Sequence, residues 1–111
     1  MNTGIRTIIY PVKDLTKAKA QFGGLLGVKP YVDQAYYVGF SIGDQQIGLV
    51  PASQSEGMTA FFHVDNIRQS LQSLLDAGAQ TLEEVKDVGG GKLVGSVKDT
   101  DGNIIGLIQE P

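Results

Sequence analysis

The side chains that could carry out chemistry are few, and the single histidine, His63, comes first among them. An imidazole can serve as a general base or as a contact that responds to pH near neutrality. A lone histidine at a strand end more often makes a structural hydrogen bond, so we expect His63 at the rim of a pocket. The absence of cysteine excludes disulfides, thiolate zinc sites and a cysteine nucleophile. No Ser/His/Asp triad can be assembled from the remaining residues.

Three short motifs suggest chemistry but have simpler explanations. Residues 89–92 (GGGK) resemble a phosphate loop, yet Leu93 follows the lysine and no helix begins there, so we expect a flexible loop that could act as a lid. Residues 99–102 (DTDG) resemble half of a calcium loop without its distal glutamate, and they predict a turn. Glu83 and Glu84 stand in a polar stretch that we interpret as a solvated connection.

The elements that must position these residues form two similar halves. Residues 10–15 (YPVKDL) parallel residues 62–67 (FHVDNI), and residues 46–50 (QIGLV) parallel residues 104–108 (IIGLI) in the same order. Each half starts with an apolar strand, continues with a helix and ends in further strands. The sequence therefore predicts an α+β fold of two βαβββ modules, at about residues 1–52 and 58–111, within one domain.

Helix and hairpin signals support this plan. Asp14 and either Asp65 or Asn66 are suited to cap the two helices, and Gly27 and Gly78 to end them. The expected strands and linker follow from alternating apolar residues, turn residues and a serine-rich stretch. They are strands 5–12, 36–42, 46–50, 60–64, 92–98 and 104–108, and the linker 52–57.

Composition limits the possible partners. Of 111 residues, 41% are hydrophobic and 19% charged, which is typical of a folded globular domain. The net charge of −3 and the lack of a basic cluster argue against nucleic acid. No apolar run approaches the roughly 20 residues that span a bilayer, and the start of the chain does not resemble a secretory signal. We expect a soluble, cytoplasmic protein that binds neither nucleic acid nor membrane.

The doubled plan and three motifs resemble one known family. The motifs are residues 12–15 (VKDL) after the first strand, 25–27 (LLG) closing the first helix, and 101–103 (DGN) before the last strand. Together they are similar to the vicinal oxygen chelate superfamily, which includes glyoxalase I, extradiol dioxygenases, fosfomycin-resistance enzymes and bleomycin-binding proteins. The resemblance implies mixed sheets curled into a cup. It also implies that metal-dependent members place one ligand on each of four inner strands.

The positions that the resemblance assigns to metal ligands carry no suitable donors here. They correspond to Thr7, Gly48, Thr59 and Gly106, where metal-dependent relatives usually have histidine or glutamate. Glycine offers no side-chain donor, and a neutral threonine hydroxyl is a poor ligand for a divalent cation. We therefore expect no metal site and no cofactor.

Strand parity separates the residues that pack under the helices from those that line the cup, because side chains alternate across a strand. The helix-facing row is continuously apolar: Ile8, Tyr10, Val12, Ile47, Leu49, Phe62, Val64, Ile105 and Leu107. The cup-facing row mixes apolar and small polar residues, as a ligand cavity requires. It contains Thr7, Ile9, Gln46, Gly48, Thr59, Phe61, His63, Gly106 and Ile108, joined by Tyr37 and Ser41 if the hairpin at Gly43 and Asp44 is tight.

These observations predict a metal-independent protein that binds a small, partly apolar molecule in the cup, in the manner of the bleomycin-binding members. The alternative is a metal-free isomerase or lyase that uses His63 or Tyr37 as an acid or base. A divergent metal enzyme with relocated ligands is a third possibility. A homodimer is expected, since the resemblance implies cups completed across subunits and an open sheet leaves edges and an apolar face exposed.

Overall fold

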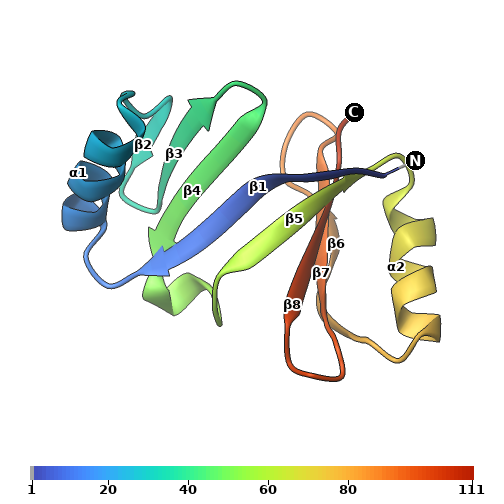
Figure 1. Ribbon diagram of the computed structural model, residues 1–111. Helices are drawn as coiled ribbons and strands as arrows, with labels where there is room; N and C mark the ends of the chain where they lie inside the picture. Colours follow the sequence, from blue (N-terminus) through green and yellow to red (C-terminus); the bar gives the residue numbers. More distant parts are fainter. Residues whose placement is uncertain (1) are drawn as a thin grey trace. The chain divides into compact units, whose positions relative to one another are not determined.

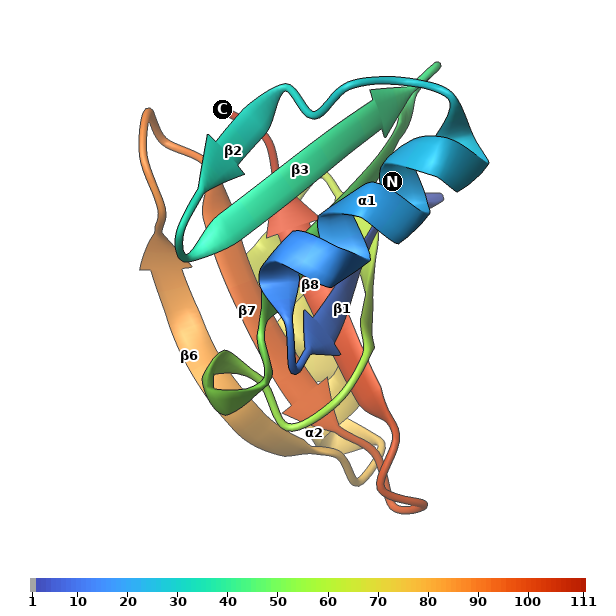
Figure 2. The ribbon, with the colours of Figure 1, turned by 90° about the vertical axis from the view of Figure 1, so that its left-hand side faces the viewer.

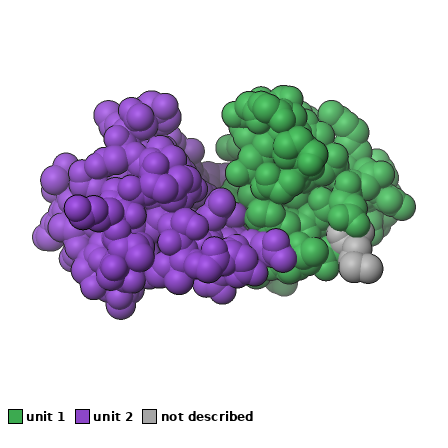
Figure 3. Space-filling model, turned by 90° about the horizontal axis from the view of Figure 1, so that it is seen from above, with its two compact units in different colours: residues 1–5, 59–111 green, residues 6–58 purple. Residues whose placement is uncertain are grey.

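The computed structural model describes residues 2–111 and confirms an α+β fold with a strand, a helix and three strands in each half (Figure 1). The elements follow in this order: β1 (Asn2–Val12), α1 (Leu15–Leu26), β2 (Val32–Gln34), β3 (Tyr37–Ile42), β4 (Gln45–Pro51), the 3₁₀ helix η1 (Ala52–Gln54), β5 (Thr59–Val64), α2 (Ile67–Asp76), β6 (Gln80–Asp87), β7 (Leu93–Lys98) and β8 (Ile104–Gln109). Two compact units result: unit 2 comprises residues 6–58, and unit 1 comprises residues 59–111 with residues 1–5 (Figure 3).

In unit 2 the strands lie in the order β2-β3-β4-β1, with β1 parallel to β4 and the other neighbours antiparallel. Helix α1 lies across one face of this sheet (Figure 2). Its Ala18 and Phe22 pack against Val38, Phe40 and Leu49 of β3 and β4. The predicted helix-facing residues Tyr10, Val12 and Ile47 join the same core, so strand parity is correct in this unit.

Unit 1 repeats the arrangement with the strand order β5-β8-β7-β6. Its core joins Ile67 and Leu71 of α2 to Phe62, Val64 and Leu107 of β5 and β8. These three strand residues belong to the predicted helix-facing row. The eight strands belong to one sheet, four in each unit. The four strands of each unit have one face covered by the unit's own helix and an opposite face without a helix, which we call the helix-free face.

The ends of the elements explain where they begin and stop. Asp14 accepts a hydrogen bond from Lys17 N, and Asn66, rather than Asp65, accepts one from Gln69 N. Gly27 ends α1 with a φ of 71°, a left-handed conformation that favours glycine. Neither helix in the described part of the chain is long and apolar enough to cross a membrane.

One expected connection is wrong. Glu83 and Glu84 lie inside β6, not in a loop between elements. The pairing of β6 with β7 shifts register on both sides of Glu83, and β6 is the outer strand of its unit. Bulges of this kind break the alternation from which a strand is recognised in sequence, and an edge strand carries exposed charges.

Candidate functional site

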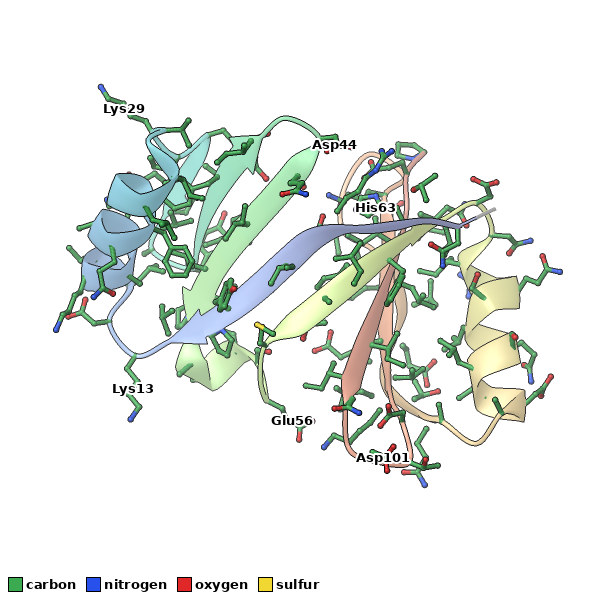
Figure 4. All side chains as sticks on the ribbon, viewed as in Figure 1. Lys13, Lys29, Asp44, Glu56, His63 and Asp101 are labelled. Atoms are coloured by element: carbon green, nitrogen blue, oxygen red, sulfur yellow. The ribbon has the colours of Figure 1, made fainter. Side chains whose placement is uncertain are left out.

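The helix-free face of unit 2 collects six of the predicted site residues. In the strand register, Thr7 lies beside Gln46, and Gln46 beside Ser41. The next row across the sheet contains Ile9, Gly48 and Gly39. The hairpin between β3 and β4 has only Gly43 and Asp44 between its strands, and Asp44 lies at its tip (Figure 4). This tight turn puts Tyr37 and Ser41 on the same face as Gly39, as expected.

An aromatic ring covers Gly48. A methyl group placed on Gly48 would come within 2.5 Å of both Ile9 Cδ1 and Tyr37 Oη. On the neighbouring strand, a methyl group on Gly39 would lie 2.9 Å from the Tyr37 ring and 3.0 Å from the Tyr31 ring. Tyr37 thus lies against Gly48 and Gly39, and Tyr31 lies against Gly39. Glycine is required for these close approaches.

The phenol of Tyr37 is not suited to act as a base. Burial raises the pKa of Tyr37 well above its ordinary value, and the charge and hydrogen bond of the neighbouring Tyr31 raise this pKa further. The hydroxyl therefore stays protonated at neutral pH. In that state it can donate or accept a hydrogen bond, while the raised pKa makes it a weaker acid than an ordinary tyrosine.

On the helix-free face of unit 1, the ring of a phenylalanine covers a glycine, as the ring of Tyr37 covers Gly48 in unit 2. Phe61 lies beside Gly106, and Gly106 beside Ser96. A side-chain carbon on Gly106 would collide with the Phe61 ring. The next row contains His63, Ile108 and Val94, so the register places four of the predicted residues of this unit on β5 and β8 as neighbours. The fifth, Thr59, is buried on β5.

The residues at the family's ligand positions do not fit a metal ion. Thr7 and Thr59 are buried and neutral, while Gly48 and Gly106 are covered by Tyr37 and Phe61. Within residues 2–111, no group of three or more His, Cys, Asp or Glu side chains could hold a metal ion. A divalent cation needs carboxylate, imidazole or thiolate donors that these positions do not supply.

The sole histidine belongs to a small charged cluster at the end of its sheet. His63 lies near the end of β5 (Figure 4), and its side chain is 12% exposed. Its Nδ1 is 3.9 Å from Glu110 Oε1, and Lys92 Nζ is also 3.9 Å from that oxygen. The backbone carbonyl of His63 accepts a hydrogen bond of 3.3 Å from Thr3 Oγ1.

Four residues of these faces were missed by the sequence reasoning: Tyr31, Ser96, Lys92 as a functional side chain, and Glu110. Tyr31 precedes the three-residue strand β2, too short to show alternation. Ser96 and Lys92 could have been predicted from strand alternation. Both are an odd number of residues from Leu93, which packs on the core, so their side chains point to the opposite face. Glu110 follows the last strand, where no pattern indicates its direction.

Comparisons with known proteins agree with this architecture. A sequence profile described as the Glyoxalase/Bleomycin resistance protein/Dioxygenase superfamily matches residues 4–107. No curated protein matches the sequence.

Several solved structures share the fold. A superfamily member from Vibrio splendidus 12B01 is similar with a TM-score of 0.75 and 13% identity, covering 100% of both chains. Methylmalonyl-CoA epimerase from Mycobacterium tuberculosis gives 0.74 at 17% identity, covering 99% of this chain and 89% of its own. The Streptomyces coelicolor methylmalonyl-CoA epimerase (Q60A), in complex with 2-nitronate-propionyl-CoA, gives 0.76 at 12%, covering 99% of both. At these identities the likeness concerns the fold alone.

Proposed function

The chain belongs to the glyoxalase/bleomycin resistance protein/dioxygenase superfamily, and on this premise we propose that it binds a small, partly apolar molecule reversibly and without a metal ion. One observation carries the proposal: both glycines at the family's ligand positions are covered by aromatic rings. Tyr37 lies on Gly48, and Phe61 lies on Gly106. Each helix-free face therefore presents an aromatic floor where a metal-dependent relative would present donor atoms.

The residues around the Tyr37 and Phe61 rings suit a small molecule that is mostly apolar and carries a polar group at one end. Ile9 lies beside Gly48, and Ile108 beside His63. Gln46 and Ser41 supply an amide and a hydroxyl in the adjoining row of unit 2, whereas the hydroxyl residue beside Gly106 in unit 1, Ser96, is buried. Apolar walls with a few polar groups that orient the guest are typical of small-molecule sites. We further propose that the protein acts as a homodimer.

A thermal-shift screen against compound classes, run with and without divalent cations, tests the function. A specific guest raises the unfolding temperature by mass action, and at about 100 times its Kd it adds roughly 2.7 kcal/mol. We expect aromatic or branched apolar compounds to stabilise the protein equally with Mg²⁺, Mn²⁺, Zn²⁺ or a chelator present. Stabilisation that requires one of these cations would contradict metal independence. A screen without any stabilising compound would contradict the binding function.

The second candidate is a metal-free isomerase or lyase. It is favoured by the position of His63, whose Nδ1 lies 3.9 Å from a carboxylate oxygen of Glu110, because a small side-chain movement would form the hydrogen bond that orients an imidazole for proton transfer. The raised pKa of Tyr37 argues against that residue in either role, because the phenol stays protonated at neutral pH and releases its proton less readily than an ordinary tyrosine. In D₂O, an enzyme of this class would exchange a carbon-bound proton of the guest, and His63→Asn would abolish the exchange while leaving binding in place. A bound guest that gains no deuterium indicates a binding protein.

A further inference from the structure

The charged cluster of His63, Lys92 and Glu110 lies on the helix-free face of unit 1 and is not part of the hydrophobic core of that unit. One carboxylate oxygen of Glu110 stands 3.9 Å from both the imidazole Nδ1 of His63 and the ammonium of Lys92. This distance exceeds that of a hydrogen bond, for which about 2.7–3.2 Å is usual. Glu110 is 55% exposed, and ion pairs of exposed groups contribute little to stability. Its carboxylate is therefore held loosely between two nitrogens.

Backbone hydrogen bonds hold Lys92 in a turn, whereas Glu110 follows the last strand. The loop between β6 and β7 closes through hydrogen bonds from Val88 N to Lys92 O (2.9 Å) and from Lys92 N to Gly89 O (3.1 Å). Gly89 and the two glycines after it have φ values of 129°, 63° and 88°, where glycine is favoured. Residues 89–92, predicted from sequence as a flexible loop, thus form a hydrogen-bonded turn that places the backbone of Lys92. Glu110 lies beyond the end of β8.

We propose that His63 and Lys92 form a carboxylate subsite for the guest, and that Glu110 occupies this subsite until the guest displaces it. This inference rests on the proposed binding function and names the chemical class of its ligand. A monocarboxylate fits best because it presents the same group that Glu110 already places there. An imidazole N–H and an ammonium can both donate to a carboxylate, and such charge-assisted hydrogen bonds are the strong ones.

The register sets the distance between this subsite and the aromatic floor. Phe61 and His63 are two residues apart on β5 and point to the same face. Since a strand rises about 3.3 Å per residue, the two side chains start about 7 Å apart. The guest should therefore carry its carboxylate at roughly that distance from an aromatic or branched apolar group. The compound 3-phenylpropionate has this form, and 3-phenylpropionamide is its uncharged match.

Nuclear magnetic resonance can follow the subsite directly, because His63 is the sole histidine and its ring signals need no assignment. We expect 3-phenylpropionate to shift these signals saturably, and the amide to bind about tenfold more weakly or not at all. Lys92→Met should weaken binding of the carboxylate about tenfold. Glu110→Gln should strengthen it about fivefold, since it removes a competing and repelling charge.

Matched variants control for net charge. Glu84→Gln, on the exposed edge of unit 1, and Lys29→Met, in unit 2, alter the charge equally and should leave affinity unchanged. Equal affinity for the acid and the amide would overturn the subsite while leaving apolar binding intact. Weaker or unchanged binding by Glu110→Gln would overturn the displacement. Inorganic phosphate shifting the His63 signals as strongly as the acid would overturn the assignment to carboxylates. A screen in which neutral compounds also fail to bind would instead contradict the proposed function itself.

Discussion

Glycine at positions 48 and 106 has two consequences that follow from one missing side chain. It removes the donor atom that a metal ion would need, and it allows Tyr37 and Phe61 to lie directly on the backbone. The close contact between ring and backbone and the absence of a metal-ligating side chain therefore have the same cause, which is glycine at these two positions. Side chains at these positions would not project into an empty pocket, because the rings already occupy that space.

Replacing Gly106 by alanine should destabilise the fold. The new methyl group would meet the Phe61 ring near its attachment, where the ring has little freedom to move. Overpacking of this kind costs typically about 1–3 kcal/mol, which urea unfolding would measure. Phe61→Leu combined with Gly106→Ala should recover part of the loss. Gly24→Ala is the control: nothing lies within 4 Å of that position in α1, so it should stabilise by about 0.5–1 kcal/mol.

The raised pKa of Tyr37 predicts how stability depends on alkaline pH. The unfolded chain loses this phenolic proton near pH about 10, whereas the folded protein keeps it at higher pH. Above that pH the unfolded state binds fewer protons, so the free energy of unfolding falls as pH rises, by at most about 1.4 kcal/mol per pH unit.

Unfolding by urea between pH 9 and 11 would measure the slope. Tyr37→Phe should flatten this pH dependence, although losing the hydrogen bond with Tyr31 lowers stability at neutral pH by about 1 kcal/mol. Tyr36→Phe, at a 62% exposed side chain, should leave the slope as it is. An identical slope in Tyr37→Phe and the parent protein would show that Tyr37 ionises normally.

Among the secondary-structure elements, the strands with regular alternation and the helix ends were predicted correctly from sequence. The elements whose position depends on pairing with other strands were missed. The alternation in β1, β4, β5 and β8 correctly separated core residues such as Leu49 and Leu107 from those on the helix-free faces. The cap at Asp14 and the stop at Gly27 depend on short-range geometry and were also correct. Strand β6 is bulged, and Glu110 follows the last strand, so tertiary pairing alone places them.

The first turn of α2 is held by two side-chain acceptors, and the contribution of its N-cap residue can be tested. Asn66 Oδ1 accepts from Gln69 N at 3.1 Å, and Gln109 Oε1 accepts from Ile67 N at 2.8 Å. Asn66→Ala should cost about 1 kcal/mol in urea unfolding, because the Gln69 N–H loses its acceptor. Asn66→Asp should retain nearly full stability, since aspartate caps equally well. An alanine variant as stable as the parent would mean that Asp65 takes over the cap.

At the scale of the whole molecule, the two units are variations on one design. In each, a helix packs on an apolar face, and an aromatic ring lies on a glycine on the other face. Only unit 1 adds a histidine, a lysine and a glutamate at the end of its sheet. Within unit 1, the aromatic ring of Phe61 and the His63 side chain lie on one face, which is consistent with the proposed guest that has a single polar group.

Association of two copies is the last expectation. Several large apolar side chains remain exposed: Leu25 is 78% exposed, Tyr36 62% and Met58 54%. The outer strands are poorly suited to pair with another chain, since β2 has three residues and β6 carries Glu83, Glu84 and Lys86. A dimer should therefore form through apolar surface and not by joining strand edges.

Light scattering at micromolar concentration should give twice the chain mass of 11.8 kDa. Leu25→Ser or Tyr36→Ser should shift the protein toward the monomer, because each removes apolar area that association would bury. Glu84→Lys, on the β6 edge, should leave the dimer intact. If Glu84→Lys disrupts the dimer while both serine variants preserve it, the interface runs along the strand edge. A parent protein that stays at 11.8 kDa contradicts the dimer altogether.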